Sequence, residues 1–217
     1  MFGSTDQLVT AAILIAIFLL VAFPIHEFSH ALAAYRLGDS TARLFGRLTL
    51  NPLVHFDPIG GSLLALSILM GGGFGWAKPT PVNPRNLEGG RWGEAIVAAA
   101  GPLSNLVLAV AGAIPLRYIV ATNMDAGIVG DVLLDFVEIN LLLMIFNFIP
   151  VPPLDGGAVL FAFLPPDVSW RLRPLLAQYG LLILIVLILP LSGESIIQRI
   201  FGIVVIPLLY LLTGIRV

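Results

Sequence analysis

Long apolar segments dominate this chain and restrict it to a fold that crosses a membrane several times. The hydrocarbon core of a bilayer is about 30 Å thick, and a helix of about 20 apolar residues spans it. Hydrophobic residues make up 58% of the chain and charged residues only 11%, against about 25% charged in a typical soluble domain. The sequence therefore predicts an all-α polytopic membrane protein. Its five expected transmembrane helices cover residues 8–37, 94–117, 128–149, 175–191 and 195–214.

One segment between the first two expected spans is unlike a membrane helix. The apolar run from Ser62 to Met70 is too short to span a bilayer, and three glycines follow it. The next residues, Phe74 to Val82, contain a glycine and two prolines, which disfavour a helix and suit an extended edge strand. Irregular backbone is tolerated at membrane depth only where protein or water covers it. Residues 58–82 are therefore expected to form a re-entrant, β-like insertion.

The sequence indicates a single domain. It contains no internal repeat and no linker, so we expect one membrane-embedded domain over residues 1–217, with a core at 8–165 and C-terminal helices at 175–214. The formal net charge of −2 is too small to indicate a nucleic-acid partner. The lipid bilayer is the expected surrounding, and the oligomeric state stays open.

Lysine and arginine residues are distributed unequally between the two ends of the expected spans. Cytosolic loops carry an excess of these residues, which sets the orientation of a membrane protein. If the insertion returns to the side of the membrane from which it enters, nine of these basic residues fall on one side of the membrane and only Arg117 and Arg199 on the other. The nine are Arg36, Arg43, Arg47, Lys78, Arg85, Arg91, Arg171, Arg173 and Arg216. This distribution predicts an outer N-terminus, a cytosolic C-terminus and a cytosolic segment at 38–93. The membrane is expected to be that of a prokaryotic cell.

Two histidines lie four residues apart around a glutamate in the first span, as His26-Glu27-Phe28-Ser29-His30. On a helix this spacing places both imidazoles on one face with the glutamate beside them, which is typical of sites that bind zinc and activate water. The chain has no cysteine, so His, Asp, Glu or neutral groups would have to hold a metal. One histidine alone more often bonds to a neighbouring helix, but three ionisable groups together are costly in lipid. The cluster predicts a zinc site in the cytosolic half of the first span.

A third ligand is expected from the segment that follows the third span. A catalytic zinc ion usually takes three protein ligands and keeps a fourth position for water. The third span would run from outside to inside, which brings Asp155 to the membrane depth of His30. Prolines break the helix before Asp155, and two glycines after it allow a close turn. Asp155 is therefore the best candidate, with a turn role as the alternative because Asp-Gly is a common turn pair.

Two motifs in this order resemble those of the site-2 proteases, the intramembrane zinc metalloprotease family. That family has H-E-x-x-H on one membrane helix and N-x-x-P-x-P-x-L-D-G at the end of a later one, and residues 26–30 and 147–156 match both. The sequence Ala-Gly-Pro-Leu-Ser-Asn at 100–105 is similar to the family's G-P-x-x-N. The resemblance covers about residues 8–165 and is to the minimal form of the family, without a PDZ-like or nucleotide-binding CBS (cystathionine β-synthase type) domain.

The resemblance implies a zinc endopeptidase that cleaves transmembrane or membrane-anchored protein substrates near the cytosolic face. It implies that His26, His30 and Asp155 ligate one zinc ion. It also implies that Glu27 is the general base, which takes a proton from water and later passes one to the leaving amine.

Two asparagines are candidate substrate contacts. Asn147 matches the family's asparagine that holds substrate backbone, and Asn105 is expected to line the same cavity. An amide suits this task because it donates and accepts hydrogen bonds without adding a charge. A structural bond is the alternative for Asn147, and Gly-Pro-x-x-Asn is also typical of a helix start with close packing. The extended segment at 74–82 is expected to capture unwound substrate by strand addition.

A zinc transporter or channel is the main alternative function. In such a protein the same His, Glu and Asp side chains would pass the ion across the membrane rather than use it for hydrolysis. A transporter is expected to have relay sites on both sides of the midplane or a repeated half, and the sequence shows neither. The clustered site on one side favours catalysis.

Four other polar residues have no assigned role in this chemistry. His55 and Asp57 are expected to brace a turn, with an accessory metal ligand, a proton shuttle or a gate as alternatives for His55. Asp135 and Glu138 lie in the third expected span, where they either face a hydrated interior or precede the true start of that span.

Overall fold

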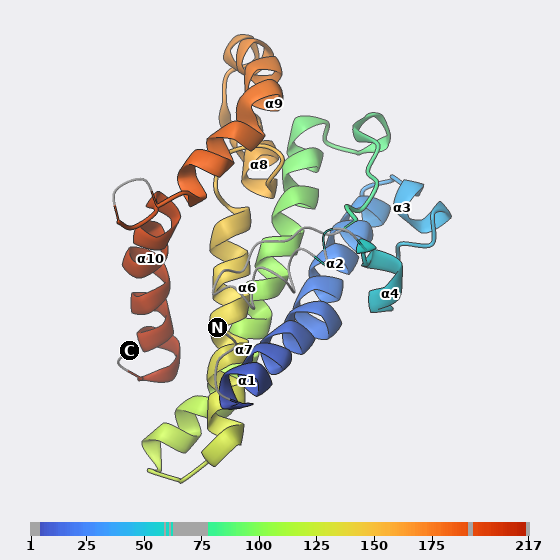
Figure 1. Cartoon of the computed structure of the whole chain (residues 1–217). Helices are drawn as coiled ribbons and strands as arrows, with labels where there is room; N and C mark the ends of the chain where they lie inside the picture. Colours follow the sequence, from blue (N-terminus) through green and yellow to red (C-terminus); the bar gives the residue numbers. More distant parts are fainter. Residues whose placement is uncertain (1–4, 59, 61, 63–77, 191–192, 216–217) are drawn as a thin grey trace.

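Helices form most of the computed structural model, which describes residues 5–58, 60, 62, 78–190 and 193–215. No β-strand occurs among these residues, in agreement with the expected all-α class (Figure 1). Four described helical segments are long and apolar enough to cross a membrane: Ala12–Arg36, Arg91–Ala121, Pro166–Ile188 and Ile196–Thr213. The fold is that of an all-α membrane protein.

The first span is continuous but contains a wide turn. Helix α1 (Thr5–Ile17) passes through a π-helical turn at Phe18–Ala22 into α2 (Phe23–Arg36). Pro24 lies in the first turn of α2 and has no N–H to donate to the preceding turn. A π-helical turn accommodates such a gap in the hydrogen-bond ladder and often lies next to a functional site. Here it ends one turn before His26.

Helix α6 lies at the centre of the structure. α6 (Arg91–Ala121) and α7 (Gly127–Asn147) form an antiparallel hairpin, and both pack against α10 (Ile196–Thr213). α2 and α8 (Asp155–Phe163) also pack against α6 (Figure 1). Between lipid-embedded helices, small side chains allow close packing, and two alanines of α6 are buried in this way. The buried core is formed by Ala109, Ala113, Leu116, Val137, Leu141, Met144, Ile145, Val205 and Leu209.

The third and fourth expected spans differ in part from the structure. α7 has 21 residues, but its three carboxylates leave it outside the set of helices apolar enough to cross a membrane. Asp135 and Glu138 are half-buried and lie well inside α7, which begins at Gly127. α9 (Pro166–Ile188) begins before Pro174 and continues through it, so the expected start of the fourth span at residue 175 is wrong. Proline is tolerated inside membrane helices because neighbouring groups satisfy the freed carbonyl.

The end of α10 lies against the end of α6. Arg117, near the end of α6, donates hydrogen bonds to the carbonyl oxygens of Leu211 and Leu212 at the end of α10. The sequence predicts Arg117 outside and the end of the last span in the cytosol, whereas the structure brings Arg117 and the end of α10 together, so the two expectations do not hold at once. α10 runs on away from the end where α9 begins rather than returning to it (Figure 1).

The segment between α2 and α6 is only partly described. The expected β-like insertion at 58–82 falls largely on residues outside the described part, and residues 78–82, which are described, form neither helix nor strand. Two short helices, α3 (Thr41–Leu44) and α4 (Pro52–His55), precede the insertion, and a 3₁₀ turn at Pro84–Asn86 follows it.

The turn around α4 is braced by the two polar residues expected there. His55 is fully buried, and its Nε2 lies 2.8 Å from the carbonyl oxygen of Thr49. The Asp57 carboxylate accepts a hydrogen bond of 2.8 Å from the backbone N–H of Gly60. These contacts agree with a structural role for both side chains.

Candidate zinc site

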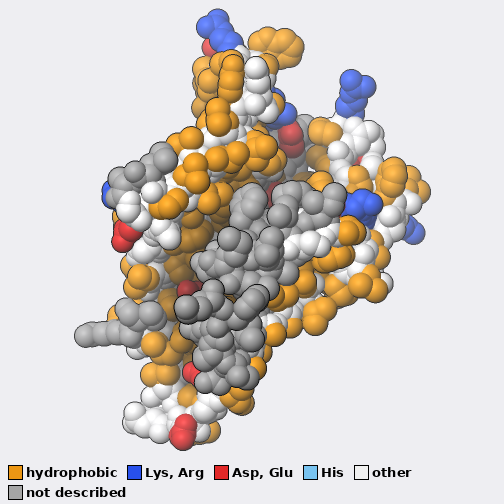
Figure 2. All heavy atoms as spheres, viewed as in Figure 1, with side chains coloured by type: hydrophobic (Ala, Val, Ile, Leu, Met, Phe, Trp, Pro, Cys, Tyr) orange, Lys and Arg blue, Asp and Glu red, His pale blue; other side chains and the backbone are white. Residues whose placement is uncertain are grey.

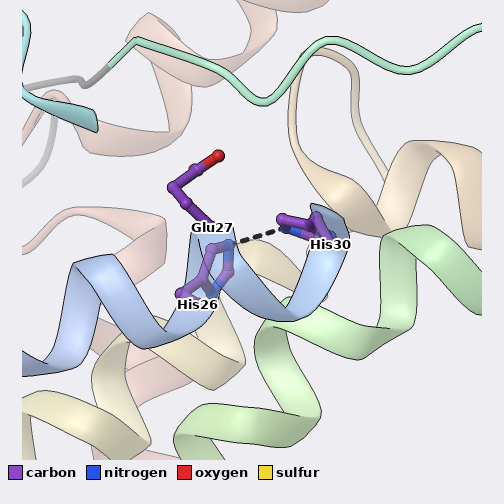
Figure 3. A group of neighbouring side chains, drawn as sticks. All are labelled: His26, Glu27 and His30. Atoms are coloured by element: carbon purple, nitrogen blue, oxygen red, sulfur yellow. Dashed lines mark hydrogen bonds between the residues drawn. The ribbon is translucent and has the colours of Figure 1, made fainter. Parts of the chain in front are cut away.

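His26 and His30 face the same point on one side of α2. Their Nε2 atoms lie 3.0 Å apart, as the dashed line in Figure 3 shows, and their ring centroids are 4.6 Å apart. Both side chains are buried. The spacing of four residues on one helix therefore brings the two imidazoles together as the sequence predicts.

Asp155 reaches the same point from the first turn of α8. Its Oδ2 lies 3.3 Å from Nε2 of each histidine. This oxygen is buried and forms no hydrogen bond with the part of the chain that the structure describes. A Cβ at Gly156 would lie 2.4 Å from the carbonyl oxygens of Phe148 and Ile149, so glycine is needed for α8 to fold back against the end of α7. This close turn directs Asp155 toward α2.

The hydrogen bonds of the two imidazoles fix which nitrogen of each ring carries the proton. His30 Nδ1 lies 2.7 Å from the carbonyl oxygen of Val97, which can only accept, so Nδ1 carries the hydrogen. His26 Nδ1 lies 2.7 Å from Oδ1 of Asn105. The Asn105 amide is oriented by its Nδ2, which donates to the carbonyl oxygen of Ala22 at 3.3 Å. In both neutral rings the lone pair is therefore on Nε2.

Three hydrogen-bond acceptors thus converge on one point. They are the two Nε2 lone pairs and the Asp155 carboxylate oxygen, at mutual distances of 3.0–3.3 Å. Buried acceptors without a donor are unfavourable unless a cation lies among them. In a tetrahedral zinc site with ligand bonds of about 2.0–2.1 Å, the donor atoms lie about 3.3 Å apart. The residues therefore fit a zinc ion.

Gly101 allows α6 to pass directly over the two imidazoles. A Cβ at this position would lie 2.3 Å from Nε2 of His30 and 2.7 Å from Cε1 of His26. Any side chain would therefore displace the rings. The glycine of the Gly-Pro-x-x-Asn motif has a steric role at the site, and the asparagine of the same motif orients a ring.

Glu27 lies beside the imidazoles, and its carboxylate points away from them (Figure 3). The candidate ligand atoms of His26, Glu27 and His30 all lie within 4.8 Å of one another. Glu27 is buried, and its Oε2 accepts hydrogen bonds from the backbone N–H of Thr80 at 2.9 Å and from the Thr80 hydroxyl at 2.7 Å. The carboxylate is close enough to the imidazoles to share a water molecule with an ion held between them.

Asn105 is fully buried behind His26. It is 0% exposed, its Oδ1 lies 2.7 Å from His26 Nδ1, and its Nδ2 donates to the Ala22 carbonyl and to Asn140. It therefore supports His26 from behind, and a contact with substrate stays a prediction. The expectation that Asn105 lines a substrate cavity came from its place in the motif, and the motif does not show which way the side chain points.

Asn140 of α7 extends this support and was missed in the sequence. It is also 0% exposed, its Oδ1 accepts from Asn105 Nδ2 at 3.0 Å, and its Nδ2 donates to the Phe136 carbonyl at 2.8 Å. The signal in the sequence is a polar residue in an otherwise apolar span, which typically forms a hydrogen bond to another helix. Three helices are thus joined by amide hydrogen bonds that end on His26.

Asn147 lies in the last turn of α7 and is half-buried. Its Nδ2 donates to the Leu143 carbonyl of the same helix at 3.0 Å. Within the described residues, no hydrogen bond joins it to the two histidines or to Asp155.

Comparison with known proteins identifies the family. The sequence profile of Peptidase family M50 matches residues 12–126. The Bacillus subtilis (strain 168) protein named "Putative zinc metalloprotease YwhC" is 38% identical over 188 residues, which cover 84% of this chain and 83% of that protein. "Putative zinc metalloprotease Rip2" is 35% identical over 173 residues in Mycolicibacterium smegmatis and 32% over 171 residues in Mycobacterium tuberculosis (strain H37Rv), covering 78% of this chain and 64% of each relative. No solved structure gave a significant match. The chain therefore belongs to peptidase family M50, the site-2 protease family, and is a zinc metalloprotease.

Proposed function

We propose that this protein is an intramembrane zinc endopeptidase that cleaves transmembrane or membrane-anchored proteins near the cytosolic face of the membrane. His26, His30 and Asp155 would hold the zinc ion. The observation that supports this most directly is the convergence of their three acceptor atoms at 3.0–3.3 Å, on a helix long and apolar enough to cross a membrane. Two imidazoles and one carboxylate form a ligand set typical of hydrolytic zinc sites.

Glu27 is the proposed general base. Zinc, when bound, lowers the pKa of a water molecule to about 7 and polarises a carbonyl group. Glu27 accepts the proton of the attacking water and later delivers a proton to the leaving amine. Its carboxylate is buried next to the imidazoles, so it reaches such a water without competition from bulk solvent.

Two asparagines have different proposed roles. Asn147 uses its amide nitrogen within α7, and its Oδ1 forms no hydrogen bond with the described residues, so it can accept one from the backbone of an unwound substrate. Asn105 holds His26 in the tautomer that presents Nε2 to the metal. Partners of this kind orient metal ligands and raise metal affinity.

The distribution of charge supports a cytosolic position of the site. On the face shown in Figure 2, Lys and Arg side chains gather in the half of the molecule where α9 begins and α3 lies, and only acidic side chains are visible at the opposite end. Positively charged ends of membrane proteins face the cytosol. We therefore propose that the α3 and α8 end of the bundle is cytosolic and that the α6–α7 turn is external.

The proposed reaction is tested with the purified protein in liposomes that also carry a membrane protein with one transmembrane helix. We expect cleavage within or next to the apolar segment of this substrate, loss of cleavage when a chelator removes zinc, and recovery when zinc is added back. Mass spectrometry of the fragments locates the cut. Zinc flux across the liposome membrane without substrate cleavage would instead indicate a transporter and overturn the proposal.

Replacing Asn140 by leucine is expected to weaken zinc binding by about 10- to 100-fold, because Asn105 then loses the partner that fixes its amide. The measurement is competition for zinc against a chelator of known affinity. Gln178→Leu is the matched control, since Gln178 is exposed on α9. Parental zinc affinity in Asn140→Leu would contradict the role given to this hydrogen-bond chain.

A further inference from the structure

Residues 78–86, here called the strap, contact the glutamate of the zinc site. Thr80 directs its backbone N–H and its hydroxyl at the same oxygen of Glu27, at 2.9 and 2.7 Å, and the hydroxyl also lies 3.2 Å from the Glu27 carbonyl oxygen. In Figure 3 the Glu27 side chain extends away from the imidazoles, and these two donors bind its carboxylate there. One residue from a distant part of the chain thus determines where the carboxylate lies.

The prolines beside Thr80 prepare the strap for this contact. Pro79 and Pro81 have no N–H, so Thr80 supplies the only backbone donor among these three residues. Proline also fixes its own φ and favours an extended conformation in the residue before it. The strap therefore has little conformational freedom to lose when it presents Thr80 to Glu27.

The other end of the strap is anchored at a buried carboxylate just beyond α2. Asp39 is 0% exposed and accepts hydrogen bonds from the Asn83 backbone at 2.7 Å and from the Asn86 side chain at 3.1 Å. Thr41 donates to it from its backbone and its hydroxyl, at 3.0 and 2.5 Å. Burial opposes the charge of Asp39, but these hydrogen bonds outweigh burial and lower its pKa below the usual value, so the anchor stays ionised at neutral pH.

We propose that Thr80 is a positioning residue for the general base and that Asp39 fixes the strap that carries it. The inference rests on the proposed function, in which Glu27 exchanges protons with water and the leaving amine. Two donors on Oε2 hold the carboxylate in one orientation and leave Oε1 to face the water. Charge-assisted hydrogen bonds of this kind are strong and directional, and small displacements of a catalytic group are costly in rate.

The test compares Thr80→Val with Thr80→Ser in the liposome assay. Valine keeps the branched shape and the backbone N–H but removes the hydroxyl, whereas serine keeps the hydroxyl. We expect Thr80→Val to lower kcat by about 10- to 100-fold, with KM and zinc content unchanged, and Thr80→Ser to restore most of kcat. Thr122→Val is the matched control, because among the described residues the Thr122 hydroxyl donates to the Tyr118 and Ile119 carbonyls, at the far end of α6.

Each outcome separates the inference from the function on which it rests. If the parental protein cleaves and Thr80→Val has parental kcat, the positioning role of Thr80 is wrong while the proposed function stands. A kcat above the parental value would mean that Thr80 restrains the enzyme, and it would overturn the positioning role equally. If the parental protein does not cleave, the proposed function fails. The contact itself is measured without turnover, because the effect of Thr80→Val on the unfolding temperature should vanish in a Glu27→Ala background.

A second variant tests whether Asp39 anchors the strap, and it also tests the proposal if Thr80→Val does not fold. Asp39→Asn keeps the size of the side chain but replaces an acceptor oxygen by a donor, so it weakens the hold on Asn83 or Asn86. We expect lower kcat with unchanged zinc content. Parental kcat in Asp39→Asn would show that the strap does not need this anchor to position Glu27.

Discussion

Replacing Glu27 by glutamine removes peptide-bond cleavage in the liposome assay and leaves the zinc content near that of the parental protein. Glutamine has the shape of glutamate, and its amide oxygen can still accept the Thr80 hydrogen bonds, but it cannot take up a proton at neutral pH. General-base catalysis contributes about 100- to 10,000-fold to such reactions, so cleavage should fall by at least about 100-fold. Single-turnover cleavage and the zinc content measured on the same sample give both quantities.

Glu194→Gln is the matched control for this variant, because the same substitution is made at an exposed carboxylate before α10. It should cleave at the parental rate. Cleavage at the parental rate by Glu27→Gln itself would exclude Glu27 as the base. The inactive, zinc-loaded variant also retains bound substrates, so mass spectrometry of proteins that co-purify with it identifies them.

The core of the candidate site could be predicted from the sequence because it depends on short-range geometry. Two residues four apart on any helix face the same side, so the meeting of His26 and His30 follows from their spacing alone. The prediction that Asp155 joins them also needed the direction in which the preceding span crosses the membrane. That direction followed from the alternation of crossings, and the distance of 3.3 Å from the Asp155 carboxylate to each histidine agrees with the predicted position.

The supporting contacts could not be predicted because they depend on how helices rotate against one another. Asn105 and Asn140 lie on different helices, and spacing along one helix does not show that the two amides meet. The sequence therefore assigned Asn105 to a substrate and left Asn140 unassigned. Thr80 lies in a segment without periodic pattern, between two prolines, and nothing in its neighbours indicates a contact with Glu27 at 53 residues' separation.

The end of α10 shows a limit of reasoning from hydropathy. Counting crossings assumes that each apolar segment crosses fully and returns, and hydropathy does not show how a helix such as α9, whose first turns carry Arg171 and Arg173, runs against its neighbours. The contact of Arg117 with the end of α10 does not fit the expected number of crossings between them. This mismatch at α10 does not affect the candidate zinc site, because α2, α6, α7 and α8 position all of the residues of that site.

Replacing Asp155 by alanine should abolish both zinc binding and cleavage, unlike the change at Glu27. The variant keeps two imidazoles but loses the only charged ligand, and we expect zinc affinity to fall by more than about 100-fold, beyond the effect typical of a supporting residue. Zinc stabilises the folded chain by mass action, so a chelator should lower the unfolding temperature of the parental protein but not that of Asp155→Ala.

The metal-free forms give a further test of Asp155. In the parental protein without zinc, the Asp155 carboxylate oxygen lies 3.3 Å from Nε2 of each imidazole, so an imidazole that takes up a proton forms a buried ion pair with it. Removing the carboxylate breaks this pair, so metal-free Asp155→Ala should unfold at a lower temperature than the metal-free parental protein. Asp167→Ala, at an exposed carboxylate in the first turn of α9, is the control and should behave as the parental protein with and without zinc. If Asp155→Ala keeps parental zinc affinity, the third ligand lies elsewhere in the chain, and the site proposed around α2 and α8 is wrong.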